Sequence, residues 1–171
     1  YNKGVLSPGL ITELVRLANE QGIPTAVDPK KDQFFDYRKV TLFKPNLKEV
    51  RDSMPFAVEP EKSSLLQAAR HLRERLQHRI SLITLSEKGL FIESEQENEL
   101  HPTLPRNITD VCGAGDSVIS VATLGLAAGL SLGDIAALSN LAGGQVCEKV
   151  GVTPVDREML MQELRDFYVK K

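Results

Sequence analysis

Residues 110–117, which read DVCGAGDS, lead directly into an apolar stretch that predicts a helix. Glycines at a helix start let the backbone approach a ligand closely, and the unpaired N–H groups of the first turn, helped by the helix dipole, attract an anion. Asp116 lies inside this loop, where its charge would repel a phosphate. A carboxylate is useful there as a base that takes a proton from a hydroxyl group attacking a phosphoryl group. The alternative is that Asp116 only caps the helix, and the pattern leaves both interpretations open.

A second polar stretch, residues 44–49 (KPNLKE), follows a short apolar run that predicts a buried strand. Ligands of open α/β sheets bind beyond the carboxyl ends of the strands. Asn46 and Glu49, three residues apart at a helix start, are spaced to face a hydrated Mg²⁺, and Lys44 is placed to meet phosphate charge. The same pair also fits a capping box, which only closes the first turn of a helix. A third stretch, residues 84–89 (TLSEKG), predicts by itself no more than a turn.

Several familiar motifs are absent or incomplete in this chain. It has no GxxxxGK[ST] sequence, which excludes a P-loop protein, and residues 113–115 (GAG) lack the third glycine of the dinucleotide-binding fingerprint. Residues 115–117 (GDS) are similar to the nucleophile motif of one class of serine hydrolases. Those enzymes need a histidine base toward the chain end, whereas all the histidines here precede the motif. They have no metal-ligand spacing, and we expect each of them at the surface: His71, His78 and His101.

The elements that must position these residues alternate along the chain. Five apolar runs predict strands, the last two around a polar turn: 23–27, 40–43, 80–85, 89–93 and 99–103. Five stretches predict helices by the spacing of their apolar residues: 10–20, 60–76, 114–130, 135–150 and 158–169. We therefore expect an α/β layered fold with a mainly parallel sheet and antiparallel edge strands. One rim of that sheet would collect the polar residues at strand ends and helix starts: Asp28, Lys44, Asn46, Glu49, Ser86 and Asp116.

The composition suits one globular domain: 171 residues, 42% hydrophobic and 26% charged, with a net charge of −2. This balance argues against a protein that binds nucleic acid or a membrane surface, which would need a basic face. Cys112 and Cys147 are too few for a disulfide scaffold or a four-cysteine metal site, and we expect both thiols to be buried. No apolar run approaches the ~20 residues of a membrane span, and no secretory leader opens the chain, so we expect a cytoplasmic protein.

Together, the three polar stretches resemble the signatures of the ribokinase-like (PfkB-type) sugar kinases. Residues 110–117 are similar to that family's DTxGAGD[TS] motif, residues 44–49 to its PNxxE motif, and residues 84–89 to its TxGxxG nucleotide segment. Other stretches resemble the heptose-7-phosphate kinases of this family, which form the kinase half of the ADP-heptose synthases of lipopolysaccharide assembly. They are YNKGVLS at 1–7, VDPK at 27–30, YRKVTL at 37–42 and VGVT at 150–153.

The resemblance implies a three-layer ribokinase-like fold, with residues 1–171 as the carboxyl-terminal part of a single PfkB-type kinase domain. It implies transfer of phosphate from ATP, with Mg²⁺, to a hydroxyl of a sugar or sugar phosphate, here O1 of D-glycero-D-manno-heptose 7-phosphate. ATP and this small sugar phosphate are the implied partners, and the resemblance also allows a homodimer. Two other functions stay open: a non-catalytic nucleotide-binding protein of the same fold, and a kinase for another sugar phosphate or a nucleoside.

The resemblance also assigns a role to each matching residue. Asp116 would be the base, and an anion hole would be formed by the backbone N–H groups of Gly113, Ala114, Gly115 and Asp116. Mg²⁺ would be held largely through water by Asn46 and Glu49. The ATP phosphates would contact Lys44, and the nucleotide base would lie near Asn140. Ser86 and Gly89 would lie along the nucleotide. A monovalent cation such as K⁺, as in some relatives, would border Asp110 and the Cys112 carbonyl.

Two positions depart from the family's pattern. Cys112 stands where the family usually has threonine or another small residue, and Ser86 stands where glycine is common. The larger difference is that the family's sugar-binding residues and lid lie mostly in an amino-terminal half that this chain lacks. Because catalysis needs both reactants held in line, we expect this chain alone to be inactive or nearly so.

Overall fold

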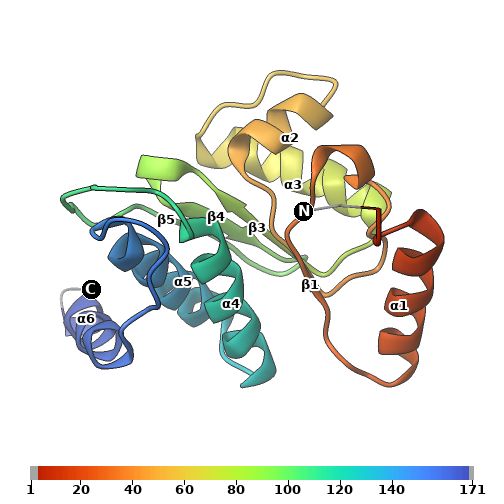
Figure 1. Ribbon diagram of the computed structural model, residues 1–171. Helices are drawn as coiled ribbons and strands as arrows, with labels where there is room; N and C mark the ends of the chain where they lie inside the picture. Colours follow the sequence, from red (N-terminus) through yellow and green to blue (C-terminus); the bar gives the residue numbers. More distant parts are fainter. Residues whose placement is uncertain (1–3, 170–171) are drawn as a thin grey trace. The chain divides into compact units, whose positions relative to one another are not determined.

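The computed structural model describes residues 4–169 (Figure 1), so residues 1–3, which begin one of the stretches similar to the heptose kinases, lie outside the described part. The described residues form two compact units. Unit 1 comprises residues 4–86 together with Phe91–Leu100. Unit 2 comprises Glu87–Leu90 together with residues 101–169.

A five-stranded sheet with the strand order β1-β2-β3-β4-β5 lies in unit 1, apart from the residues at the outer ends of β4 and β5. β1 (Ala26–Val27) pairs in parallel with β2 (Leu42–Phe43), which pairs in parallel with β3 (Ile80–Thr84). β4 (Leu90–Glu93) and β5 (Asn98–His101) form a hairpin, closed by the Ser94 N–H donating to the Glu97 carbonyl oxygen (2.8 Å). The mainly parallel sheet with an antiparallel edge is confirmed. β1 is shorter than the predicted strand 23–27 because Pro24 has no N–H for the ladder.

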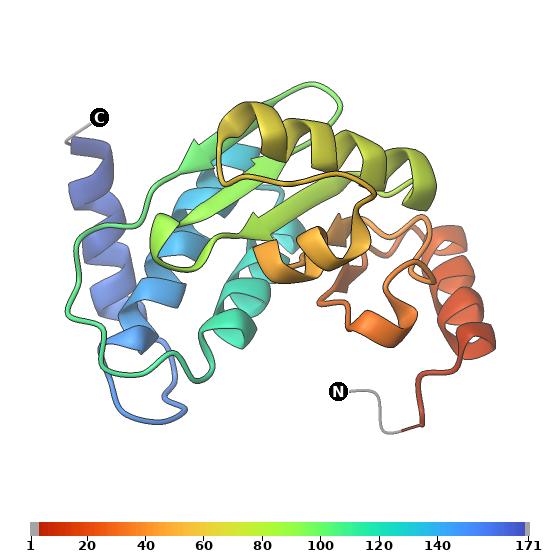
Figure 2. The same cartoon turned by 90° about the horizontal axis from the view of Figure 1, so that it is seen from above.

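Three helices and two 3-10 turns accompany the sheet, and α3 (Lys62–Leu76) lies along one of its faces (Figure 2). α1 (Pro8–Glu20) begins after Ser7, whose Oγ accepts a hydrogen bond from the Leu10 N–H (3.3 Å). α2 (Leu47–Ser53) follows β2 directly. The turn η1 (Lys31–Gln33) lies between β1 and β2, and η2 (Ser86–Lys88) follows β3. The buried residues of α3 are spaced three or four apart and form one apolar stripe: Leu65, Ala68, Ala69, Leu72 and Leu76.

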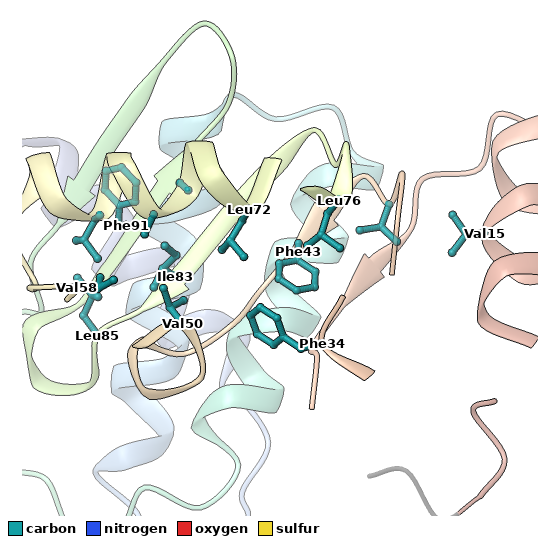
Figure 3. Close-up of a cluster of buried hydrophobic side chains, with 14 residues drawn as sticks. Val15, Phe34, Phe43, Val50, Val58, Leu72, Leu76, Ile83, Leu85 and Phe91 are labelled. Carbon is teal, nitrogen blue, oxygen red and sulfur yellow. The ribbon is translucent and has the colours of Figure 1, made fainter. Parts of the chain in front are cut away.

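The core of unit 1 lies between that stripe and the sheet (Figure 3). Phe43, Ile83 and Phe91, from three successive strands, belong to it together with the leucines of α3. Phe34 packs edge-on against Phe43, with ring centroids 5.2 Å apart. Burying one such side chain stabilises the fold by roughly 1.5–3 kcal/mol. This core therefore holds the strands in place and fixes where the polar residues after their carboxyl ends must lie.

Unit 2 consists mainly of α4 (Ala114–Ala127), α5 (Leu132–Cys147) and α6 (Arg157–Val169). Ser131 caps α5, because its Oγ accepts a hydrogen bond from the Asp134 N–H (3.2 Å). Leu160 of α6 is buried with Leu141 of α5, which joins these two helices. The three predicted helices are thus confirmed to within a few residues at each end. No helix within residues 4–169 is long and apolar enough to cross a membrane.

Two histidines are buried, so the expectation of surface histidines is wrong for His78 (2% exposed) and His101 (5% exposed). His78 lies between α3 and β3, with its Nε2 2.6 Å from Ser81 Oγ and its ring centroid 5.5 Å from that of Phe43. A hydroxyl partner and an aromatic neighbour suit the neutral imidazole. Burial, with a smaller contribution from the charge of Arg73, lowers the pKa of His78 to about 4.

Unit 1 is expected to lose stability below pH 6.5 because of His78. Its folded-state pKa of about 4 lies below the usual 6.5, so under acid conditions the unfolded chain binds a proton that the folded chain does not. Above pH 6.5, His78 therefore does not change the free energy of unfolding. As the pH falls from 6.5 to about 4, it lowers the free energy of unfolding by ~1.4 kcal/mol per pH unit. Urea unfolding across this range measures it: His78→Gln should remove this slope and His71→Gln should keep it. An unchanged slope in His78→Gln would contradict the buried neutral histidine.

Candidate active site

Two lysines and a carboxylate gather at the carboxyl ends of β1 and β2 in unit 1. Because Val27 pairs in parallel with Phe43, the residues that follow them, Asp28 and Lys44, lie side by side. Asp28 Oδ2 is 3.4 Å from Lys44 Nζ, and Asp28 Oδ1 is 3.2 Å from Lys30 Nζ. The Lys44 side chain is only 4% exposed. A buried ammonium group needs a carboxylate partner, so Asp28 allows a fixed positive charge at this edge, where the sequence predicts phosphate binding.

Asn46 and Glu49 form the capping box that their spacing predicts at the start of α2. The Glu49 N–H donates to Asn46 Oδ1 and the Asn46 N–H donates to Glu49 Oε2, both at 2.8 Å. Asn46 also pairs with Thr84 in an isolated parallel bridge, which places the start of α2 beside the end of β3. The interpretation of these residues as a helix start is therefore confirmed.

The capping box limits how these residues can hold Mg²⁺, which stays a prediction. Asn46 Oδ1 and Glu49 Oε2 each accept a backbone N–H, whereas Glu49 Oε1 lies outside the box, 4.0 Å from Lys30 Nζ. Across residues 4–169, no group of three or more His, Cys, Asp or Glu side chains could hold a metal ion. Mg²⁺ commonly keeps several of its waters and uses one or two carboxylates. These oxygens therefore suit an ion held through water, and not a closed protein cage.

The third polar stretch contains η2, and the backbone at its two ends explains why glycine suits this segment. Ser86 has φ = 55°, in the left-handed region that favours glycine, which accounts for the glycine common there in the family it resembles. Gly89 has φ = 96°, and a Cβ there would lie 2.0 Å from the His101 carbonyl oxygen and 2.8 Å from the Thr103 nitrogen. The backbone contact at 101–103 thus requires glycine at position 89, whatever its role toward a nucleotide.

Replacing Ser86 by glycine is expected to raise the free energy of unfolding by ~1 kcal/mol, because left-handed backbone is costly for any residue with a Cβ. Ser86 is exposed and its side chain makes no hydrogen bond to another residue of the described chain, so nothing else is lost. Denaturant unfolding measures the change. The neighbouring Glu87→Gly, at a residue without positive φ, is the control and should destabilise. A less stable Ser86→Gly protein would disprove the strain.

In unit 2, the glycine loop forms the start of α4. Gly113 is the N-cap, with φ = 78° in the left-handed region. The Ala114 N–H donates to the Val111 carbonyl oxygen across a turn (3.3 Å). The N–H groups of Gly115 and Asp116 belong to the first turn, where a helix offers no acceptor. Of the N–H groups predicted to form an anion hole, that of Ala114 is therefore engaged locally, and the next two have no partner within the helix.

Asp116 is not the cap of α4. Because Gly113 is the N-cap, Asp116 is the third residue of the helix, and no side chain caps this helix start. The carboxylate is exposed, and between residues 4 and 169 it has no hydrogen-bond or ion-pair partner. The interpretation of Asp116 as a mere helix cap is therefore wrong. The geometry leaves an exposed carboxylate beside first-turn N–H groups that have no partner within the helix.

The Asp110 side chain holds the glycine loop through two hydrogen bonds. Its Oδ1 accepts a hydrogen bond from the Cys112 N–H (3.0 Å) and its Oδ2 accepts one from the Gly151 N–H (2.9 Å). These bonds, the first of them most, lower the pKa of Asp110, and the carboxylate in turn raises the pKa of the Cys112 thiol. Cys112 is exposed because it lies in the loop ahead of α4, so the expectation of a buried thiol is wrong there, and Cys147 is only partly buried. The cation predicted at Asp110 and the Cys112 carbonyl stays a prediction.

Asn140 of α5, predicted to lie near the nucleotide base, has a structural partner. Its Nδ2 donates to the Pro102 carbonyl oxygen (2.9 Å), which ties α5 to the segment that leads into the glycine loop. The structure thus brings the predicted residues into two groups. Unit 1 holds Lys44, Asn46 and Glu49 beside Asp28. Unit 2 holds Asp110, Cys112 and the loop that ends at Asp116.

Three residues that support the loop in unit 2 are indicated by no motif. Arg106 forms ion pairs with Glu148 and Glu163. Gly143 and Gly144 lie inside α5, where a Cβ would be 2.7 Å from Val118 Cγ2 and 2.5 Å from Arg106 Nε, respectively. The one signal in the sequence is this glycine pair within a predicted helix, where each glycine costs about 1 kcal/mol relative to alanine.

Solved structures with the same arrangement of elements identify the fold of this chain. Phosphofructokinase-2 from Escherichia coli in complex with potassium matches with a TM-score of 0.85 at 20% identity, over 97% of this chain and 54% of that one. Arabidopsis thaliana ribokinase complexed with ribose and ATP matches with a TM-score of 0.79 at 16% identity, over 93% of this chain and 53% of that one. The fold is therefore ribokinase-like, as the resemblance implies.

The family follows from sequence comparison. The model of the pfkB family of carbohydrate kinases matches residues 3–158, and this chain belongs to that family. It is 39% identical over 165 residues to the bifunctional protein HldE of Syntrophotalea carbinolica, covering 96% of this chain and 34% of that protein. It is 38% identical over 165 residues to the bifunctional protein HldE of Methylobacillus flagellatus, with the same coverage of 96% and 34%. The chain thus spans about a third of the length of the curated relatives it matches.

Proposed function

We propose that this chain is part of a kinase that transfers the γ-phosphoryl group of ATP to O1 of D-glycero-D-manno-heptose 7-phosphate. The observation that carries the proposal is Asp116, a carboxylate in the first turn of α4 that is exposed and has no hydrogen-bond or ion-pair partner within residues 4–169. Membership of the pfkB family supports a carbohydrate acceptor. The likeness to HldE proteins, and the stretches at 27–30, 37–42 and 150–153, support heptose 7-phosphate as that acceptor.

In this reaction Asp116 takes the proton of the acceptor hydroxyl while the hydroxyl oxygen attacks the γ-phosphorus. A new phosphorus–oxygen bond forms, the bond between the γ-phosphorus and the β,γ-bridging oxygen breaks, and ADP leaves. The N–H groups of Gly115 and Asp116 donate to the oxygens of the transferring group, so preorganised donors meet the developing charge. Because Asp116 is exposed, its proton then passes to solvent.

The residues of unit 1 act on the nucleotide. The buried Lys44 ammonium opposes the charge of the ATP phosphates, and Asp28 keeps that ammonium in place. Mg²⁺ neutralises phosphate charge when bound, and Asn46 and Glu49 would hold it through water. Binding of the nucleotide along Ser86, Gly89 and Asn140, and of K⁺ at Asp110 and the Cys112 carbonyl, belongs to the same proposal.

The activity is that of the complete protein. The chain spans about a third of its curated relatives and about half of the solved kinases, so its own residues are a part of the machinery. Alone, it is expected to release little or no ADP, because the reaction needs both reactants held in line. ATP as the donor makes the cytoplasm the expected location, and a homodimer is a further expectation that light scattering would test.

ADP release by the complete protein, measured with a panel of acceptors, tests the proposal. The panel is heptose 7-phosphate, fructose 6-phosphate, ribose and a nucleoside. We expect kcat/KM for heptose 7-phosphate to exceed the others by about tenfold or more, since a pocket separates close analogues by roughly that factor. Preference for another acceptor would replace the substrate and keep the kinase. Binding of ATP without ADP release for any acceptor would identify a non-catalytic nucleotide-binding protein.

A further inference from the structure

The segment 102–113, which leads to the glycine loop, contains no helix or strand and yet is held along α5 of unit 2. Near its start, Asn140 binds the carbonyl of Pro102. Near its end, the N–H groups of Thr109 and Asp110 both donate to the Cys147 carbonyl oxygen, at 2.8 Å and 3.1 Å. Arg106 lies between these two attachments, and its side chain forms ion pairs with Glu148 and Glu163.

Arg106 joins the segment to two helices through charge-assisted contacts. Its Nη1 lies 2.8 Å from Glu148 Oε2 at the end of α5, and its Nη2 lies 2.7 Å from Glu163 Oε2 on α6. The arginine side chain is only 6% exposed. A planar guanidinium held by two carboxylates has a fixed direction, which a single hydrogen bond would not give. The backbone at residue 106 is therefore fixed relative to α5 and α6.

Gly144 is the residue of α5 over which Arg106 passes. A Cβ at this position would lie 2.5 Å from Arg106 Nε and 2.9 Å from its Cδ. Glycine inside a helix costs about 1 kcal/mol relative to alanine. The Arg106 side chain occupies the space that a Cβ at position 144 would take. Glycine at this position, despite its cost to the helix, therefore lets Arg106 cross α5.

The path from Arg106 to Asp116 is short and continuous. Three residues after Arg106, Thr109 is bonded to the end of α5, and the carboxylate of Asp110 then binds the N–H groups of Cys112 and Gly151. These bonds set the direction in which the chain enters the N-cap of α4. A shift of the segment would therefore move the first turn of α4, including Asp116.

We propose that Arg106, held over Gly144 by Glu148 and Glu163, is a positioning residue for Asp116. The inference rests on the proposed kinase activity. Removing the guanidinium should leave the binding of substrates largely intact and misplace the base. A misplacement of about 1 Å can lower the rate roughly 100-fold, so kcat should fall by about 10- to 100-fold with little change in KM.

Four variants of the complete protein test this: Arg106→Gln, Glu163→Gln, Gly144→Ala and, as control, Arg73→Gln. Arg73 pairs with the buried Glu93 in unit 1, at 2.5 Å, so its loss also strands a buried carboxylate. Gly144→Ala is the sharpest probe, because alanine favours the helix and yet displaces the arginine. We expect kcat to fall in the first three variants, with KM for ATP and acceptor unchanged, and to keep its wild-type value in Arg73→Gln. If kcat falls in proportion to the loss of stability in all four variants, Arg73→Gln included, the proposal is overturned.

Hydrogen exchange separates this inference from the proposed function. Arg106→Gln should speed amide exchange at Cys112 and Gly151, whose N–H groups bind Asp110, and Arg73→Gln should not. If the wild-type protein transfers no phosphate, the proposed function fails and the exchange rates still decide whether Arg106 orders the loop. Unchanged exchange at both amides in Arg106→Gln would overturn the positioning role whatever the activity.

Discussion

Replacing Asp116 by asparagine is expected to lower kcat for phosphoryl transfer by roughly 10²- to 10⁴-fold, the range by which a positioned base accelerates proton transfer. The variant keeps the shape of the side chain and loses its capacity to accept the proton. Because Asp116 is exposed and has no partner within residues 4–169, the fold should survive the change. Steady-state kinetics of the complete protein, together with its urea unfolding curve, measure both effects.

Asp134→Asn is the matched control for this variant. Asp134 occupies the same third position of α5 that Asp116 occupies in α4, and it also follows a glycine. Both substitutions therefore remove a first-turn carboxylate and its favourable interaction with the helix dipole. Asp134 instead accepts hydrogen bonds from Ser131 and Tyr168, so its loss should affect stability and leave kcat unchanged. Equal activity in Asp116→Asn and Asp134→Asn would rule out Asp116 as the base.

Gly89→Ala is expected to be among the most destabilising single substitutions in this chain, at roughly 3–5 kcal/mol, from a backbone clash added to an unfavourable φ. The new Cβ would lie 2.0 Å from the His101 carbonyl oxygen, and the Thr103 nitrogen and Pro102 carbonyl carbon are also within 3 Å. These are backbone atoms, so no side chain can rotate away. Chemical denaturation of purified protein measures the loss, and accumulation of insoluble protein would be its extreme form.

Gly129→Ala separates the two causes of that loss. Gly129 also has positive φ, 71°, and a Cβ there would meet no atom within 4 Å. Its substitution should therefore show the backbone strain alone, ~1 kcal/mol. If Gly89→Ala were no more destabilising than Gly129→Ala, the close approach of the chain at 101–103 would be disproved.

The start of α2 could be predicted because its cause is local. The capping box at Asn46 depends on residues within one turn, and its spacing is visible in the sequence. Alternating apolar runs likewise indicated the parallel sheet and its antiparallel edge. These features do not depend on which distant segments meet.

Contacts between distant segments could not be predicted. Arg106 meets Glu148 and Glu163, which lie 42 and 57 residues further along the chain, and no periodicity marks such a set. His78 is buried by the packing of a helix end against the sheet, and the residue type alone does not reveal this burial. Whether Asp116 caps its helix depended on which residue takes left-handed backbone, and Gly113 does so. Residue types alone left that choice open.

The most direct test of the proposed kinase follows the labelled γ-phosphate of ATP. The complete protein is incubated with [γ-³²P]ATP, Mg²⁺ and D-glycero-D-manno-heptose 7-phosphate, and the products are separated. We expect the label in the heptose 1,7-bisphosphate, with one ADP formed for each sugar phosphorylated. Label that stays in ATP, or that appears only as inorganic phosphate, would contradict the proposed transfer of the γ-phosphoryl group to heptose 7-phosphate.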